Sequence, residues 1–310
     1  MAFVGALIVV LIVMAVLNHV AAEASDRAPA DGSRLYAYRT TVQGPLQLEV
    51  FNPPDWHTSD RRPAIVFFFG GGWTHGTRQQ FAPQARHFAS RGMVAITADY
   101  RIRGIHGTTP ADAVDDARAA LRWICAYYRE LGIDPQRLVA GGGSAGGHLA
   151  AAAALCPEPP AEGPADRPPC RPAALVLFNP VLDLADMSQL FPGSMQEKQE
   201  AARQVSPVLF VGADAPPAIL FYGTDDRFLA HGRRYVDAAL AAGARAELFT
   251  AAGQIHAFFN RPPWFEATLL KADDFLVSLG YLKPRSDVPG AVSVTLNVHR
   301  PATAASARTL

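Results

Sequence analysis

The sequence lacks an excess of charge of either sign. Its 310 residues include 28 lysines and arginines and 28 aspartates and glutamates, so the formal net charge is zero. It also lacks a basic stripe with interleaved aromatic residues, the pattern typical of nucleic-acid-binding surfaces. These absences argue against a nucleic-acid partner. The length and the hydrophobic content of 49% fit one large α/β domain with a substantial core.

Cysteine is scarce, because the chain has three cysteines and none of them forms a C-x-x-C motif. A zinc site or a thioredoxin-type site is therefore not expected. In an oxidising compartment Cys156 and Cys170 could form a disulfide across the proline-rich segment that separates them. Cys125 would then be a buried thiol in a helix.

Positive charge is missing from the N-terminus, where no lysine or arginine precedes Arg27. Residues 2–17 are nevertheless uninterrupted apolar, and Ala22-Glu23-Ala24 follows as a small-residue cleavage pattern. The sequence therefore predicts a signal peptide over residues 1–24 and a secreted or periplasmic protein. An uncleaved membrane anchor is the alternative, although the run is shorter than the about 20 residues of a spanning helix.

Internal repeats are absent, and short apolar runs alternate instead with helical patterns. After a flexible linker over residues 25–34, alternating residues over 35–51 predict an antiparallel hairpin. Continuous apolar runs predict strands buried on both faces at 64–69, 94–99, 137–140, 174–178, 218–222 and 246–249. Helical patterns occupy 79–90, 110–131, 145–155, 231–242 and 264–279.

This order of elements predicts an α/β fold over residues 35–283. We expect a doubly wound, mainly parallel sheet with helices on both faces and the hairpin strands as an antiparallel edge. The tail over residues 284–310 is rich in small and polar residues, and we expect it to be flexible and to lie outside the fold. In such sheets the functional site lies beyond the carboxyl ends of the strands.

A G-x-S-x-G motif places Ser144 between Gly142 and Gly146, where a predicted strand meets a predicted helix. The flanking glycines allow a sharp turn that exposes the serine hydroxyl at the edge of the sheet. Glycine-rich turns also bind phosphate groups. The motif alone therefore leaves a nucleophile and a phosphate-binding turn open.

Three successive glycines end the first buried strand, just before Trp73. The N–H groups of Gly71 and Gly72, with that of Ala145 at a helix N-terminus, could form an oxyanion hole. A plain glycine-rich turn is the alternative. Trp73 and His75 follow directly and are candidates for substrate binding.

A nucleophilic serine needs a base and an acid, in the chain order Ser–Asp–His. His256 lies between the last buried strand and the last helix, and is the candidate base. For the acid, Asp226 is preferred over its neighbour Asp225, and Asp183 is a further candidate whose ordinary role would be to cap a loop. His148 lies one helical turn after the serine and is expected to be a packing residue.

These motifs together resemble an α/β-hydrolase of the esterase and lipase class, in particular the feruloyl- or acetylxylan-esterase-like carbohydrate acyl esterases. The resemblance spans about residues 46–282. It rests on Phe69-Gly-Gly-Gly-Trp73, Asp99-Tyr-Arg101, Gly132-Ile-Asp-Pro135, the segment 142–148, Gly223-Thr-Asp-Asp226 and His256. Related enzymes carry a histidine before the three glycines, whereas Phe69 stands here. Phenylalanine cannot hydrogen-bond, so another group must hold this loop.

The resemblance implies a serine carboxylic-ester hydrolase that needs no metal or cofactor. Ser144, His256 and Asp226 would form the triad, with a small-molecule or carbohydrate ester as substrate. Residues 183–216 are the only sizeable insertion near the site, which favours short acyl groups, including acetyl or feruloyl esters of carbohydrates. An amide hydrolase such as an arylformamidase or peptidase is the alternative within this fold, and a non-catalytic ligand-binding protein is the alternative outside enzymes.

Overall fold

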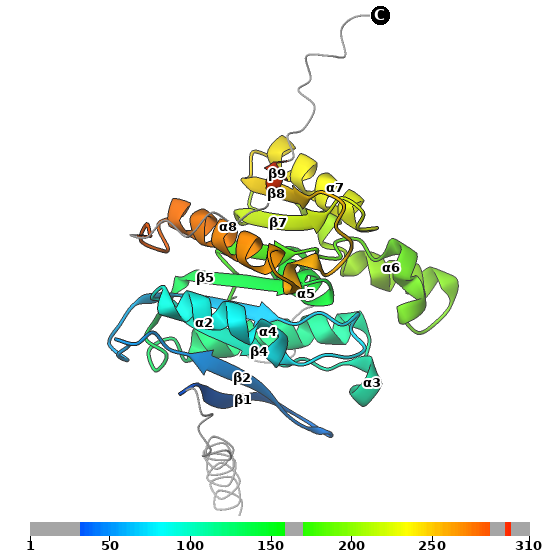
Figure 1. Cartoon of the computed structure of the whole chain (residues 1–310). Helices are drawn as coiled ribbons and strands as arrows, with labels where there is room; N and C mark the ends of the chain where they lie inside the picture. The colour runs from blue at the N-terminus through cyan, green and yellow to red at the C-terminus, as the bar shows by residue number, and fades with distance from the viewer. Residues whose placement is uncertain (1–31, 159–169, 286–294, 299–310) are drawn as a thin grey trace, which may run out of the picture.

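The computed structural model describes residues 32–158, 170–285 and 295–298 (Figure 1). The expected signal peptide and most of the expected linker lie outside these residues. Among the helices that the structure describes, none is long and apolar enough to cross a bilayer.

Nine strands form a single sheet in the order β1-β2-β4-β3-β5-β6-β7-β8-β9. The strands are β1 (Arg34–Thr41), β2 (Gly44–Phe51), β3 (Arg62–Phe68), β4 (Val94–Ala98), β5 (Ile133–Gly143), β6 (Ala174–Phe178), β7 (Ala218–Gly223), β8 (Ala246–Ala251) and β9 (Leu296–Val298). Strands β3 to β8 pair in parallel, while β1 and β2 form the antiparallel edge. The predicted doubly wound α/β fold is confirmed.

Helices cover both faces of the sheet (Figure 1). The α-helices are α2 (Ala82–Ser90), α3 (Arg103–His106), α4 (Pro110–Ala126), α5 (Ala145–Leu155), α6 (Met195–Gln204), α7 (Leu229–Ala241) and α8 (Trp264–Ser278). Short 3-10 helices are η1 (Arg78–Phe81), η2 (Ala185–Leu190), η3 (Pro207–Phe210) and η4 (Phe258–Asn260). Helices α2 and α8 lie on one face, and α4, α5 and α7 lie on the other. Insertion 183–216 holds η2, α6 and η3.

The start of α4 shows how local sequence sets an element. The Thr109 hydroxyl accepts from the Asp112 N–H at 3.3 Å, and the Asp112 carboxylate accepts from the Thr109 N–H at 2.8 Å. With Pro110 at the first helical position, this is a complete capping box. The helix ends at Ala126, earlier than the pattern over 110–131 predicted. The remaining residues turn toward β5 through Gly132, which has a left-handed φ of 62°.

Residues 296–298 of the expected tail form strand β9 of the sheet. The expectation that residues 284–310 lie outside the fold is therefore wrong for these three residues. Residues Leu296 to Val298 pair antiparallel with Phe249 to Ala251 of β8. Without β9 this edge of β8 would present unpaired N–H and C=O groups. The strand had a local signal, because residues 292–298 read Val-Ser-Val-Thr-Leu-Asn-Val and alternate apolar with polar side chains. The small and polar composition of the whole tail obscured it.

The expected Cys156–Cys170 disulfide is also wrong. Cys170 is bonded to Cys125, with a Cα–Cα distance of 6.1 Å, and Cys156 is a free, buried thiol. Helix α4 packs beside α5, which brings Cys125 near the end of α4 to the segment that leads into β6. Cys156 directly follows α5, and its side chain is buried in the core. Proximity in sequence is therefore a poor guide to pairing here.

The sheet register aligns the strand ends that carry the candidate site. Phe68 of β3 pairs with Gly142 of β5, and Gly143 pairs with Phe178 of β6. Phe178 in turn pairs with Phe221 of β7. The segments that follow these strands therefore emerge side by side at one edge of the sheet.

Candidate active site

Ser144 occupies the sharp turn between β5 and α5. Its φ of 53° and ψ of −116° are unusual for a residue other than glycine. The flanking glycines are required by space, since a Cβ on Gly142 or Gly146 would lie 2.4 or 2.0 Å from the Phe68 carbonyl oxygen. The close approach of β3 thus explains the G-x-S-x-G spacing physically, and it presents the serine hydroxyl at the sheet edge.

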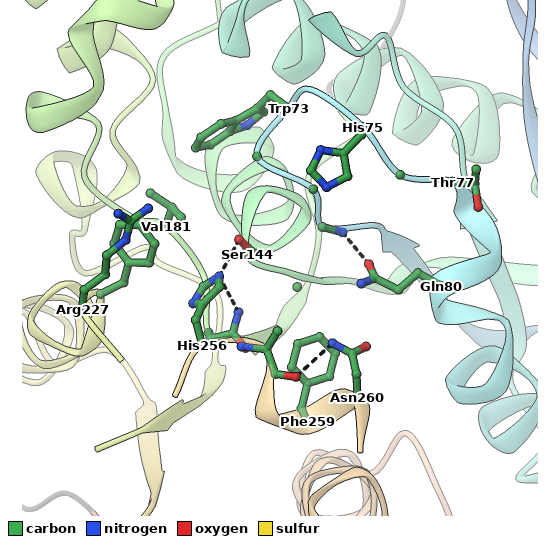
Figure 2. Close-up of a pocket in the computed structure, with 18 of the residues that line it drawn as sticks. Trp73, His75, Thr77, Gln80, Ser144, Val181, Arg227, His256, Phe259 and Asn260 are labelled. Atoms are coloured by element: carbon green, nitrogen blue, oxygen red, sulfur yellow. Dashed lines mark hydrogen bonds between the residues drawn. The ribbon is translucent and has the colours of Figure 1, made fainter. Parts of the chain in front are cut away.

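The structure brings Ser144, His256 and Asp226 together, although they come from three different strand ends. His256 Nε2 lies 2.8 Å from Ser144 Oγ (Figure 2), and His256 Nδ1 lies 2.8 Å from Asp226 Oδ2. A carboxylate can only accept, so Nδ1 carries the proton and Nε2 is free to accept from the serine hydroxyl. The Asp226 side chain is fully buried, and its Oδ1 accepts from the Phe228 N–H at 2.9 Å. This arrangement allows His256 to remove the serine proton.

The two other candidate acids lie elsewhere. Asp225 is exposed, and its Oδ1 accepts from the Thr224 hydroxyl at 3.1 Å. Asp183 accepts from the Ala185 N–H at 3.0 Å and forms an ion pair with Arg234 at 2.6 Å. Asp183 therefore caps a loop, and neither residue contacts His256.

The glycine loop, residues 70–72 after β3, has a backbone conformation that favours glycine. Gly71 and Gly72 have φ values of 134° and 60°, and a Cβ on Gly71 would lie 1.9 Å from the His75 carbonyl oxygen. Ala145 is the first residue of α5, where N–H groups have no partner within the helix. The N–H groups of these three residues have no hydrogen-bond acceptor among the residues described.

The loop is held without the histidine that the related motif carries. Gln80 of η1 accepts from the Gly70 N–H at 2.6 Å (Figure 2). The Tyr100 hydroxyl donates to the Phe69 carbonyl at 2.9 Å, and the two rings stack with centroids 4.1 Å apart. The substitution at Phe69 is thus accompanied by a stacking contact and by two hydrogen bonds to the backbone of the loop.

Asn179, which follows β6, is a site residue that sequence reasoning missed. It is fully buried with a left-handed φ of 36°. Its Oδ1 accepts from the Ala257 N–H at 3.2 Å, and its Nδ2 lies 3.3 Å from His256 Nε2. A polar residue directly after a buried strand was the available signal, since that is where sites of parallel sheets form.

A cavity of about 620 Å³ opens beside Ser144. Its lining includes Gly71, Gly72, Trp73, His75, Gln80, Ser144, Asn179, Val181, Met187, Arg227, Phe228, His256 and Phe259. Trp73 and His75 both lie in the lining, but the Trp73 ring is buried and offers little surface to a substrate. Within the described residues no group of three or more His, Cys, Asp or Glu side chains is arranged to hold a metal ion.

Comparison with known proteins places this site in a family. The BD-FAE family model matches residues 48–233, which is more than half of the chain. The chain belongs to the BD-FAE family. This BD-FAE protein is also similar to solved structures of Est2, a thermophilic esterase from Thermogutta terrifontis. The propionate-bound form has 40% identity and a TM-score of 0.77, covering 83% of this chain and 98% of that chain.

A second Est2 structure, phosphorylated by paraoxon, has 40% identity and a TM-score of 0.76, covering 84% of this chain and 100% of that chain. The probable carboxylic ester hydrolase LipM of Mycobacterium tuberculosis is 31% identical over 61% of this chain and 48% of its own length. The probable isoprenylcysteine alpha-carbonyl methylesterase ICMEL1 of Oryza sativa is 28% identical over 68% of this chain and 54% of its own length. This BD-FAE protein spans about half the length of these curated relatives. The resemblance to α/β-hydrolases of the esterase class is confirmed.

Proposed function

We propose that this BD-FAE protein is a serine carboxylesterase that acts on short acyl esters. The observation that supports it best is the continuous contact from Asp226 through His256 to Ser144, with 2.8 Å at each step. The glycine loop and the first turn of α5 border the same hydroxyl. The named functions of the similar proteins, which are ester hydrolases, support the same reaction.

In the proposed reaction Ser144 Oγ attacks the ester carbonyl carbon while His256 Nε2 takes the hydroxyl proton. The carbonyl oxygen becomes negative and is stabilised by the N–H groups of Gly71, Gly72 and Ala145. The C–O bond to the alcohol then breaks, and His256 returns the proton to the leaving alcohol. Water, deprotonated by His256, attacks the acyl-enzyme, and the carboxylic acid leaves as Ser144 regains its proton.

We expect short acyl groups to occupy the cavity. Apolar side chains of Val181, Met187, Phe228 and Phe259 line it, and they can bury a few methylene groups. Est2 has been solved with propionate and with butyrate bound, which supports acyl chains of this length for a protein that is 40% identical. Acetylated and feruloylated carbohydrates are the finer proposal, because the sequence motifs resemble enzymes for such esters.

A substrate panel tests the proposal. We expect kcat/KM to be highest for 4-nitrophenyl acetate, propionate and butyrate, to fall for the octanoate, and to vanish in Ser144→Ala. Acetylated xylan, methyl ferulate, N-formylkynurenine and dipeptides belong in the same panel. Faster turnover of the amides would favour the amide-hydrolase alternative, and tight binding without turnover would favour a ligand-binding protein.

Export from the cytoplasm is a separate proposal. The apolar N-terminal run predicts a signal peptide, and the Cys125–Cys170 disulfide supports an oxidising compartment. N-terminal sequencing of the protein from its natural host tests this. A mature chain that begins after Ala24 is the expected result, whereas an intact apolar run in the membrane fraction would favour the anchor.

A further inference from the structure

His148 makes three connections from one buried position. It lies in the first turn of α5 and is fully buried, and its N–H donates to the Ser144 carbonyl at 3.0 Å. Its imidazole Nδ1 lies 3.1 Å from Trp73 Nε1, and its Nε2 lies 2.6 Å from the Val205 carbonyl oxygen. One side chain therefore links the helix of the proposed nucleophile, the glycine loop and insertion 183–216.

The partners fix the protonation state of this imidazole. An indole N–H can only donate, so Nδ1 of His148 must be the unprotonated acceptor. A carbonyl can only accept, so Nε2 must carry the proton and donate to Val205. Burial favours the same neutral form, since it lowers the pKa of His148 to about 4.

Trp73 links His148 to the glycine loop, whose N–H groups are the proposed oxyanion donors. It follows Gly72 directly and has a left-handed φ of 59°, which is unfavourable for a tryptophan. Its buried ring meets the His148 ring edge-on, with centroids 5.2 Å apart. A loop in a strained conformation persists only when its surroundings hold it. The hydrogen bond that the indole N–H donates to His148 is such a restraint.

Val205 carries the connection into the wall of the cavity. It directly follows α6, and the hydroxyl of the next residue, Ser206, accepts from the Leu184 N–H at 2.9 Å. Leu184 immediately precedes η2, which supplies Met187 to the cavity lining. The His148–Val205 bond therefore restrains the segment that forms one wall of the cavity.

We propose that His148 is a positioning residue with two separable effects, which rests on the proposed esterase function. The hydrogen bond between its Nδ1 and Trp73 holds the glycine loop, and the hydrogen bond between its Nε2 and Val205 holds insertion 183–216. The first contact should govern turnover, because oxyanion donors act in the transition state. The second contact should govern substrate affinity, because the insertion lines the acyl cavity.

Two isosteric variants separate these effects. An asparagine oxygen takes the place of Nδ1, so His148→Asn keeps the acceptor for Trp73 and loses the bond to Val205. A glutamine amide takes the place of Nε2, so His148→Gln keeps the donor to Val205 and loses the acceptor for Trp73. We expect kcat to fall about 10- to 100-fold in His148→Gln with little change in KM, since small misplacement of a catalytic group has effects of this size. In His148→Asn we expect KM to rise and kcat to change less.

Trp73→Phe tests the same bond from the other side, because it removes the indole N–H and keeps an aromatic ring. It should lower kcat as His148→Gln does, and the double variant should be no worse than either single variant. Each kcat is calculated from the concentration of active sites titrated by paraoxon, so that misfolded protein does not lower the value. His57→Gln changes an exposed histidine, is the matched control and should keep both kcat and KM.

The proposal is overturned if folded His148→Gln and Trp73→Phe keep the wild-type kcat. It is also overturned if, in both His148 variants, kcat falls and KM rises only in proportion to the loss of thermal stability. Nitrogen-15 NMR of His148 gives a reading that needs no esterase activity. We expect the neutral Nε2–H form at pH 7 and a shift of the Nδ1 signal in Trp73→Phe. A protonated ring, or an unchanged Nδ1 signal, would contradict the positioning role even if the wild-type protein hydrolysed no ester.

Discussion

Asp226 and Asp225 are neighbours with the same side chain, but only Asp226 reaches His256. Asp226→Asn would keep the shape of the acid while favouring the wrong tautomer of the histidine. We expect kcat on a short ester to fall by about 10⁴-fold, as occurs when a triad acid is replaced this way. Asp225→Asn is the matched control and should stay close to the wild type. Equal losses in both variants would contradict the assignment of the acid.

Gln80 accepts from the Gly70 N–H of the glycine loop, where Phe69 stands in place of a histidine. In Gln80→Ala the Gly70 N–H loses its acceptor, and the glycine loop loses a restraint. We expect kcat to fall about 10- to 100-fold, because donors to the oxyanion must be placed to within a fraction of an ångström. Gln136→Ala removes an exposed glutamine near the opposite end of β5 and should leave steady-state kinetics unchanged. A wild-type kcat in Gln80→Ala would show that Tyr100 alone holds the loop.

Individual residues differed in how far the sequence could predict them. Ser144, Asp226 and His256 carry their own signal, since each has a chemically active side chain in the segment that follows a predicted strand. Gln80 and Asn179 act through backbone N–H groups of other segments, Gly70 and Ala257, that only the folded chain brings near. The contacts themselves leave no local pattern in a single sequence, so the one signal was the place of Asn179 directly after a buried strand.

Helices α2 and α8 are joined by a buried carboxylate. Asp273 is fully buried and accepts from Arg91 Nε at 2.7 Å, His87 Nε2 at 3.0 Å and Arg285 Nη1 at 2.7 Å. Burial alone would raise the pKa of Asp273, but the hydrogen bonds from His87 and Arg91, with the charges of both arginines, hold it below its ordinary value.

Asp273→Asn should therefore lower the free energy of unfolding by about 1.5 to 3 kcal/mol, because Arg91 and Arg285 lose the charge of a buried hydrogen-bond acceptor. Urea unfolding at pH 7 measures this change. The neighbouring Asp274, which is half exposed, gives the control Asp274→Asn, with an expected loss below about 1 kcal/mol. The lowered pKa contributes stability above the ordinary pKa of aspartate, so the difference between wild type and Asp273→Asn should shrink as the pH falls below about 4. Equal losses in the two variants would contradict the role of Asp273.

Elements with strong local patterns were predicted closely. Helix α5 and strand β6 have the predicted bounds, and α4 begins where its capping residues predicted. Boundaries set by tertiary contact were not predicted. Strand β5 begins at Ile133 rather than 137 because Ile133 pairs with Arg62 of β3. Strand β9 pairs with the edge of β8, and it was missed although residues 292–298 alternate apolar with polar side chains.

The disulfide joins Cys125 in α4 to Cys170 in the segment before β6, two residues that are 45 positions apart in the sequence. Unfolding in guanidinium without a reductant should expose one reactive thiol, Cys156, and reduction should expose all three cysteines. The folded protein should react with no thiol reagent, because Cys156 is buried and burial raises its pKa to about 12. Three reactive thiols before reduction would contradict the Cys125–Cys170 pairing.

The central claim is that Ser144 is a nucleophile activated by His256. Its most direct test is paraoxon treatment followed by mass spectrometry of the digested protein. We expect one diethylphosphoryl group per chain, on the peptide that contains Ser144, with esterase activity lost in equal proportion and no adduct in Ser144→Ala. Loss of activity with Ser144 unmodified, or no adduct on a folded, active protein, would contradict the account.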